Sequence, residues 1–159
     1  MLKELGITNF AIIDRIVLAF HDGLNVISGE TGAGKSILIG AIGLLLGDRA
    51  STDLIRSEED AAVVEAVFDI GAGKVLRERL QEMGFHPGRE IVVKRVVSRS
   101  GKNRVYIDGN LATVAMLGEI SETLVNVCSQ HEHQVLLDPE RHIDILDEFG
   151  NLGAPLGRY

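Results

Sequence analysis

One segment of the sequence has residue types and spacing suited to phosphate binding. Residues 29–36 read GETGAGKS and match the P-loop pattern, with an apolar segment before them and a helical pattern after them. Glycines let backbone N–H groups turn toward phosphates, and the first turn of a helix presents its positive end to an anion. The residues expected to hold the nucleotide are Gly29, Glu30, Thr31, Gly32, Ala33, Gly34, Lys35, Ser36 and Ile37.

Two side chains of this segment have the chemistry of a Mg²⁺-ATP site. Lys35 has the position from which a P-loop lysine reaches the β- and γ-phosphates, and the Ser36 hydroxyl has that of the Mg²⁺ ligand. Kinases, G proteins and motor-like ATPases share this pattern, so it does not identify the reaction.

A P-loop enzyme also needs a carboxylate at the end of a second apolar strand, the Walker B position. The segment around Asp147 and Glu148 has helical spacing, Asp48 lies beyond the helix that follows the P-loop, and Asp69 ends an alternating, half-exposed strand. The sequence therefore predicts that the chain lacks its Walker B carboxylate.

The elements that must position the P-loop follow from periodicity and turn residues. The long apolar segment after Lys35, ending near Gly47, predicts a buried helix, and the polar residues 48–60 predict a loop. The other expected strands cover 2–8, 12–20, 24–28, 62–70, 91–97, 104–107 and 124–128, and the other helices cover 74–83, 113–122 and a segment starting at 138. We expect an α/β fold with a sheet of mixed direction around the P-loop helix and a β-rich lobe.

Composition narrows the class of protein. The 159 residues are 45% apolar and 25% charged, which is typical of a globular protein, and no apolar run is long enough to span a membrane. The N-terminus does not have the pattern of a signal peptide, and the one cysteine, Cys128, cannot form an internal disulfide. We therefore expect a cytoplasmic protein. The net charge of −7 excludes a chain that is basic all over but leaves room for a local basic patch.

Such a patch is predicted on the hairpin between residues 91 and 107. Five basic residues and no acidic residue lie within it, which suits contact with a phosphate backbone. A solvated edge strand guarded by basic side chains is the alternative. The candidate DNA-binding residues are Lys94, Arg95, Arg99, Lys102 and Arg104.

Two longer stretches resemble the RecN family of bacterial DNA-repair ATPases, in the SMC-like branch of the ABC-type ATPases. They are LGITNFAIIDRIVLAFHDGLNVISGETGAGKSILIGAIGLLLGDRAS, residues 5–51, and VNVCSQHEHQVLLDPERHIDILDEFG, residues 125–150. The resemblance implies a split ATPase head: the N-terminal half carries the P-loop, a coiled coil follows, and the C-terminal half carries the signature motif and Walker B. It implies that residues 1–150 are the N-terminal half and residues 151–159 a tail near the start of the coiled coil.

The resemblance also implies roles for further residues. Gln130 matches the Gln loop, whose side chain meets Mg²⁺ and the attacking water, and Arg56 resembles an arginine that approaches the nucleotide, with Arg49 as an alternative. Without the resemblance, a surface glutamine and a solvated loop arginine are the simpler interpretations. His131 and His133 are too few to predict a zinc site.

The function expected from the resemblance is Mg²⁺-ATP binding within an ATPase of double-strand-break repair and recombination. The expected partners are the C-terminal half of the same head, a second head across ATP, and DNA, in the cytoplasm near the nucleoid and without a membrane. Hydrolysis by this chain alone is not expected. The alternatives are a self-contained small P-loop kinase or nucleotidase, and a nucleotide-dependent interaction module without catalysis.

Overall fold

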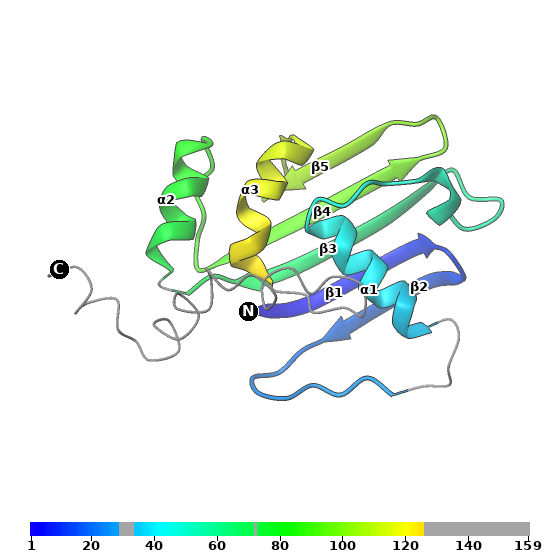
Figure 1. Ribbon diagram of the computed structural model, residues 1–159, viewed down its shortest axis with the longest axis horizontal. Helices are drawn as coiled ribbons and strands as arrows, with labels where there is room; N and C mark the ends of the chain where they lie inside the picture. The colour runs from blue at the N-terminus through cyan, green and yellow to red at the C-terminus, as the bar shows by residue number, and fades with distance from the viewer. Residues whose placement is uncertain (29–33, 72, 126–159) are drawn as a thin grey trace, which may run out of the picture. The chain divides into compact units, whose positions relative to one another are not determined.

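The computed structural model describes residues 1–28, 34–71 and 73–125. The chain divides into two units, Met1–Val125 and Asn126–Tyr159, and the described residues all belong to the first. This unit is built on a six-stranded sheet with the strand order β2-β1-β3-β4-β5-β6 (Figure 1). Each described strand pairs with its neighbours in antiparallel direction.

The strands and helices occupy most of the described sequence. The strands are β1 (Leu2–Phe10), β2 (Ile13–Ala19), β3 (Ala61–Asp69), β4 (Glu90–Ser98), β5 (Asn103–Ile107) and β6 (Asn110–Ala112). The helices are α1 (Gly34–Leu45), α2 (Lys74–Glu82) and α3 (Val114–Leu124), with a short 3₁₀ turn at Thr52–Leu54.

Strict alternation in the central strands creates one apolar face on the sheet. In β3 every second residue from Ala62 to Phe68 is buried, and in β4 every second residue from Ile91 to Val97 is buried. Since side chains of a strand alternate between its two faces, these residues line the same side, and α1 and α3 pack there (Figure 1). The residues between them are half-buried on the opposite face.

Glycine sets the end of α1. Gly47 has φ +109, and a Cβ built there would lie 3.5 Å from the Cα of Gly118 in α3. The chain therefore leaves α1 through a backbone conformation that suits glycine, at a point where two backbones approach closely. α3 begins at a conventional cap, because the Thr113 hydroxyl accepts a hydrogen bond of 3.1 Å from the Met116 N–H.

Most of the predicted elements are confirmed. β1, β2, β3, the β4–β5 hairpin and the three helices of the described residues lie where periodicity placed them, with shifts of one or two residues at their ends. The mixed direction expected for the sheet is not found among the described strands, which are antiparallel throughout.

Three details of the prediction were wrong. Residues 24–28 form no strand, and Leu24 is 91% exposed, because no neighbouring backbone among the described residues pairs with them. Leu124 ends α3 instead of starting a strand, and the short strand β6 was missed because its three residues carry no periodic signal. The expected strand residues 126–128 and the helix from 138 lie outside the described residues.

Candidate nucleotide-binding site

The candidate phosphate site lies at the first turn of α1. Gly34, Lys35 and Ser36 are exposed there. This turn contains no acidic residue, which would neutralise the positive end of the helix and repel an anionic ligand. A Cβ built at Gly34 would meet no atom within 4 Å, so the space beside the helix end is open. These residues therefore fit an anionic ligand such as a nucleotide phosphate.

The remaining predicted nucleotide-binding residues have different positions. Residues Gly29 to Ala33 lie outside the described residues, as does Gln130. The side chain of Ile37 packs against the hydrophobic core, which leaves its backbone for a ligand. The structure therefore brings together Gly34, Lys35 and Ser36 and leaves the rest of the predicted loop untested.

An apolar stripe holds α1 on the sheet. Leu38, Ala41, Leu44 and Leu45 are buried and have the spacing of one helical face. They pack toward β1, β3 and β4 (Figure 1). Because a helix is stiff, fixing this stripe also fixes the direction in which the first turn presents its N–H groups.

The last turn of α1 is anchored by the buried guanidinium of Arg95. Arg95 on β4 is 1% exposed and is the one buried polar or charged residue among those described. Its Nη1 donates to the Leu44 carbonyl, and its Nε donates to Asn103 Oδ1 at 3.1 Å. Burial lowers the pKa of Arg95 below its ordinary value, and the Asp48 carboxylate offsets part of this effect. Arg95 thus adds a second donor to the Leu44 carbonyl, which at this helix end also accepts a turn hydrogen bond of 3.3 Å from the Gly47 N–H.

The prediction that Arg95 contacts DNA is therefore wrong. A side chain that is 1% exposed cannot reach a phosphate backbone. The sequence did contain the signal, because Arg95 is in phase with Val93 and Val97, and both of these face the core. The number of basic residues on the hairpin does not show which face of the strand each of them occupies.

The other basic residues of the hairpin lie at the surface. Lys94 forms an ion pair of 3.2 Å with Glu65, directly opposite on β3. Lys102 and Arg104 are exposed and line a shallow hollow of about 320 Å³ together with Ser98 and Ser100. Lys102 and Arg104 are thus the residues of the predicted DNA patch that are open to a phosphate backbone.

Arg99 is exposed, but its guanidinium is already engaged. Nε donates to the Glu59 carbonyl, and Nη2 donates to the Arg56 carbonyl at 2.9 Å. Both carbonyls belong to the loop that precedes β3. Arg99 therefore binds this protein's own backbone, a role that the sequence did not indicate.

Arg56, the predicted nucleotide-facing arginine, lies in that loop. Its backbone N–H donates to the Asn9 carbonyl at 2.9 Å, and its Nη1 lies 3.8 Å from Asp14 Oδ1. The Arg56 side chain is 41% exposed, so this ion pair is weak and its guanidinium is accessible. Arg49, the alternative, is exposed further back in the same connection.

The two described Walker B candidates lie in different surroundings. The Asp69 carboxylate accepts a hydrogen bond of 2.7 Å from the Gly71 N–H and pairs with Arg89 at 3.2 Å, and these two contacts hold the pKa of Asp69 below its ordinary value. The Asp48 carboxylate lies over Gly43, where a Cβ would come within 2.1 Å of Asp48 Oδ2. Neither carboxylate is associated with the first turn of α1.

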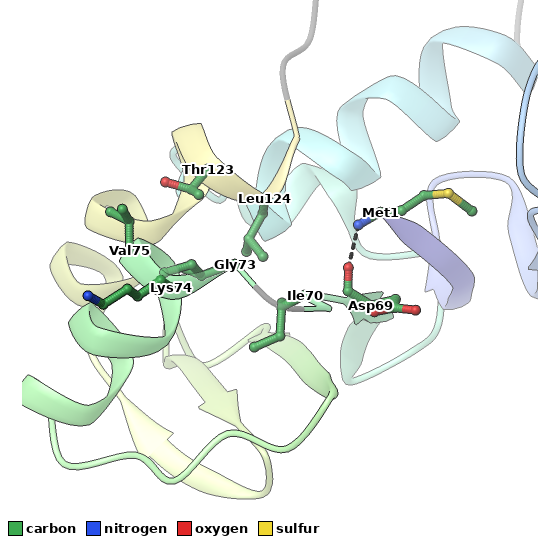
Figure 2. A pocket seen from close by; sticks show the side chains of 9 residues that line it. Met1, Asp69, Ile70, Gly73, Lys74, Val75, Thr123 and Leu124 are labelled. Atoms are coloured by element: carbon green, nitrogen blue, oxygen red, sulfur yellow. Dashed lines mark hydrogen bonds between the residues drawn. The ribbon is translucent and has the colours of Figure 1, made fainter. Parts of the chain in front are cut away.

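A separate hollow of about 220 Å³ lies between the end of β3, the start of α2 and the end of α3 (Figure 2). The amino group of Met1 donates to the Asp69 carbonyl at its rim, and the side chains of Ile70 and Leu124 contribute apolar surface. This hollow shares no residue with the candidate phosphate site.

Residues 1–28, 34–71 and 73–125 contain no group of three or more His, Cys, Asp or Glu side chains that could hold a metal ion. His131 and His133 lie outside these ranges. Within the same ranges, no helix is long and apolar enough to cross a membrane.

Comparison of the sequence with known families and proteins gives consistent matches. Residues 1–128 match the RecF/RecN/SMC N terminal domain. The chain is 43% identical over 157 residues to the DNA repair protein RecN of Halalkalibacterium halodurans, covering 98% of this chain and 27% of that protein. It is 43% identical over 150 residues to the RecN of Bacillus subtilis strain 168, covering 94% and 26%. The chain therefore spans about a quarter of the length of these curated relatives.

Solved structures with a similar fold include SMC proteins. One, from work on ATP-driven dimerization and DNA stimulated activation of SMC ATPases, has a TM-score of 0.66 and 21% identity, covering 93% of this chain and 98% of the solved chain. Another, the Smc head domain with a coiled coil and joint from Pyrococcus yayanosii, has a TM-score of 0.67 and 21% identity, covering 99% and 33%. At these identities the likeness establishes the fold.

Proposed function

Because the chain belongs to the RecF/RecN/SMC N-terminal domain family, we propose that it is the N-terminal half of an ATPase head that binds Mg²⁺-ATP and acts in DNA double-strand-break repair and recombination. One observation carries the nucleotide-binding part of this proposal. The Gly34-Lys35-Ser36 end of a P-loop sequence forms the exposed first turn of α1, and α1 is anchored along its length by core packing and at its last turn by Arg95.

In this proposal the residues at the start of α1 bind the nucleotide. The N–H groups of the first turn and the Lys35 ammonium hold the β- and γ-phosphates, and the Ser36 hydroxyl is a ligand of Mg²⁺. Bound Mg²⁺-ATP supplies the phosphoryl group, with the metal neutralising part of its charge. Gln130 orients the attacking water, and the Arg56 guanidinium stabilises charge on the phosphoryl group.

The C-terminal half of the same head is the first proposed partner. The chain spans about a quarter of the length of its curated relatives, the Asp69 carboxylate is bound to Gly71 and Arg89, and the Asp48 carboxylate lies beside Gly43. Leu24, Val26 and Ile27 are 91%, 77% and 47% exposed, directly before the P-loop. We propose that this apolar segment becomes a strand by pairing with backbone that the C-terminal half supplies.

The other proposed partners are a second head and DNA. Hydrolysis would require engagement of two heads across the nucleotide, and Lys102 and Arg104 of the β4–β5 hairpin would contact DNA phosphates. The family's role in DNA repair supports a place in the cytoplasm, near the nucleoid.

Reconstitution tests this function. We expect the 159-residue chain alone to show near-background ATP hydrolysis, because positioning and charge stabilisation provide nearly all catalysis of phosphoryl transfer and several of those groups are missing. Adding the C-terminal half as a second chain should restore turnover, and Gln130→Ala in that assembly should reduce turnover more than nucleotide binding. Vigorous, Lys35-dependent hydrolysis by the chain alone would contradict the split head and favour a small kinase or nucleotidase. Nucleotide binding without any turnover in the reconstituted head would favour the non-catalytic interaction module.

A further inference from the structure

We propose that Arg99 is a positioning residue for the reaction: it holds the loop before β3 so that Arg56 has a fixed place at the nucleotide. This inference rests on the proposed function. Arg99 makes three hydrogen bonds to this loop, all to backbone carbonyls. Its Nη2 and Nε donate to the carbonyls of Arg56 and Glu59, and its backbone N–H donates to that of Asp60 at 2.8 Å.

The end of β1 and the turn that follows it also bind this loop. The Asn9 carbonyl accepts from the Arg56 N–H at 2.9 Å, and the Asn9 side-chain amide donates to Glu59 Oε2 at 2.9 Å. The Ala11 N–H donates to the Leu54 carbonyl at 2.7 Å. The end of β1, the start of β3 and the end of β4 meet at one end of the sheet, which brings these three segments together (Figure 1).

The backbone in this region needs external support. Asn9, Ala11 and Glu58 have φ values of 53, 52 and 70, in a region that residues other than glycine rarely adopt. Such conformations persist where surrounding contacts determine them, and they are concentrated at functional sites. The contacts of Arg99 and Asn9 hold this loop together with the bridge between Phe10 and Ile55 and the turn hydrogen bond of 3.1 Å from the Glu59 N–H to the Arg56 carbonyl.

The result is an arginine with a fixed backbone and an accessible side chain. The N–H of Arg56 donates to Asn9, and its carbonyl accepts from Arg99 and, at 3.1 Å, from the Glu59 N–H. Among the described residues, its guanidinium has the 3.8 Å contact with Asp14. Because a half-exposed ion pair of this length contributes little, the guanidinium can exchange Asp14 for a phosphate with a small loss. Positioning a cation by its backbone in this way reduces the reorganisation that the reaction requires.

Charge on the hairpin does not explain these contacts. Arg104 lies on the same hairpin and carries the same charge, yet within the described residues its side chain makes no hydrogen bond or ion pair to the loop. A purely structural Arg99 would affect folding stability alone, whereas a positioning residue must act through Arg56. A double-mutant cycle separates these two roles.

The cycle is measured in the complete protein with Arg56→Ala, Arg99→Ala and the double variant. We expect Arg99→Ala to lower kcat by about tenfold to a hundredfold with the affinity for ATP little changed, since a small misplacement near the reacting atoms can have an effect of this size. The double variant should be no slower than Arg56→Ala. Arg99→Lys should recover only part of the rate, because lysine cannot hold two carbonyls in the fixed geometry of a guanidinium.

Arg79→Ala is the matched control, because Arg79 is an exposed arginine that donates to the Glu119 carbonyl at 2.9 Å away from this loop. It should leave kcat unchanged. Hydrogen exchange should show faster exchange at the amides of Arg56 and Glu59 in Arg99→Ala and not in Arg79→Ala.

Several outcomes would overturn the proposal. Independent, multiplying losses of rate in the double variant, or an equal loss in Arg79→Ala, would show that Arg99 does not act through Arg56. If Arg56→Ala keeps full turnover while Lys35→Ala abolishes it, the ATPase function stands and the inference about Arg99 fails. If Lys35→Ala also keeps full turnover, the proposed function itself fails.

Discussion

Lys35 combines a P-loop position in the sequence with an exposed place in the first turn of α1. Its ammonium is a point charge on a long stem, which suits it to follow a phosphate, while the helix backbone stays fixed by packing. At the scale of single residues, nucleotide affinity should therefore depend on this charge more than on any other described side chain.

We predict that Lys35→Ala reduces the affinity for ATP by about 1.5–3 kcal/mol, the contribution typical of a hydrogen bond to a charged group. Isothermal titration calorimetry of the purified chain measures this change directly. Lys74→Ala is the control, since Lys74 is an 84% exposed lysine on α2. Unchanged ATP binding by Lys35→Ala would remove the basis of the P-loop assignment.

Arg95 and Arg99 show how position decides the role of similar side chains. They lie four residues apart on one hairpin, and both donate to backbone carbonyls of other segments. Arg95 points into the core and supports the end of α1, whereas Arg99 follows the strand end and supports the loop before β3. Neither is a free cation available to DNA.

At the scale of elements, α1 connects the core with the candidate site. Its glycines have contrasting environments: Gly47 follows the last turn at φ +109 against α3, while a Cβ at Gly40 would meet no atom within 4 Å. The backbone conformation at position 47 requires glycine, whereas Gly40 has no such role and only lowers the helix propensity of α1.

We predict opposite effects for two alanine substitutions. Gly47→Ala should lower the free energy of unfolding by about 1–3 kcal/mol, because alanine is strained at that φ. Gly40→Ala should raise it by up to about 1 kcal/mol, because alanine favours the helix. Chemical denaturation of the chain compares the two. Equal effects of the same sign would show that the end of α1 does not require its left-handed backbone conformation.

The β4–β5 hairpin is the element proposed to contact DNA, through Lys102 and Arg104. We predict that Lys102→Ala or Arg104→Ala in the complete protein weakens DNA binding for all sequences alike. Each should reduce the slope of log K against log salt by about 0.9, the release expected for one phosphate contact. Binding titrations at several salt concentrations measure the slope, with Lys74→Ala on α2 as control. A slope unaffected by either substitution would favour a solvated hairpin edge.

At the scale of the whole molecule, the most informative feature is what the sheet leaves unpaired. β2 is an edge strand, and the segment after it reaches the P-loop without joining any described strand. Exposed apolar residues beside a ligand site are typical of a surface that another chain or domain covers.

We predict that Leu24→Ser combined with Val26→Ser leaves the stability of the chain within about 0.5 kcal/mol of the original, because both side chains are exposed. The same change should weaken association with the C-terminal half by at least about 2 kcal/mol, since burying one such side chain contributes about 1.5–3 kcal/mol. Calorimetric titration of one half with the other measures this. Leu111→Ser, at a 69% exposed leucine on the opposite edge, is the control. Equal losses for both variants would exclude residues 24–28 from the interface.

The sequence by itself determined the local parts of this protein. The P-loop spacing, the helix after it, the alternation in β3 and β4 and the turn at Asp108-Gly109 are all properties of short windows, and the structure confirms the elements they predict. Resemblance over longer stretches indicated the family, which the comparisons confirm.

Only the tertiary structure decided which side chains are buried and which distant segments meet. Arg95 lies under α1, and Arg99 binds the loop before β3, because strand order brings together residues about 40 to 50 positions apart. Residues 24–28 have the composition of a strand, yet a strand exists only where a second backbone accepts its hydrogen bonds. For Arg95 the strand phase indicated burial but not the Leu44 carbonyl that its guanidinium contacts. Local windows contain no information about partners distant in the sequence, and this is the physical reason why composition and periodicity could not predict the contacts of Arg95 and Arg99 or the missing partner of residues 24–28.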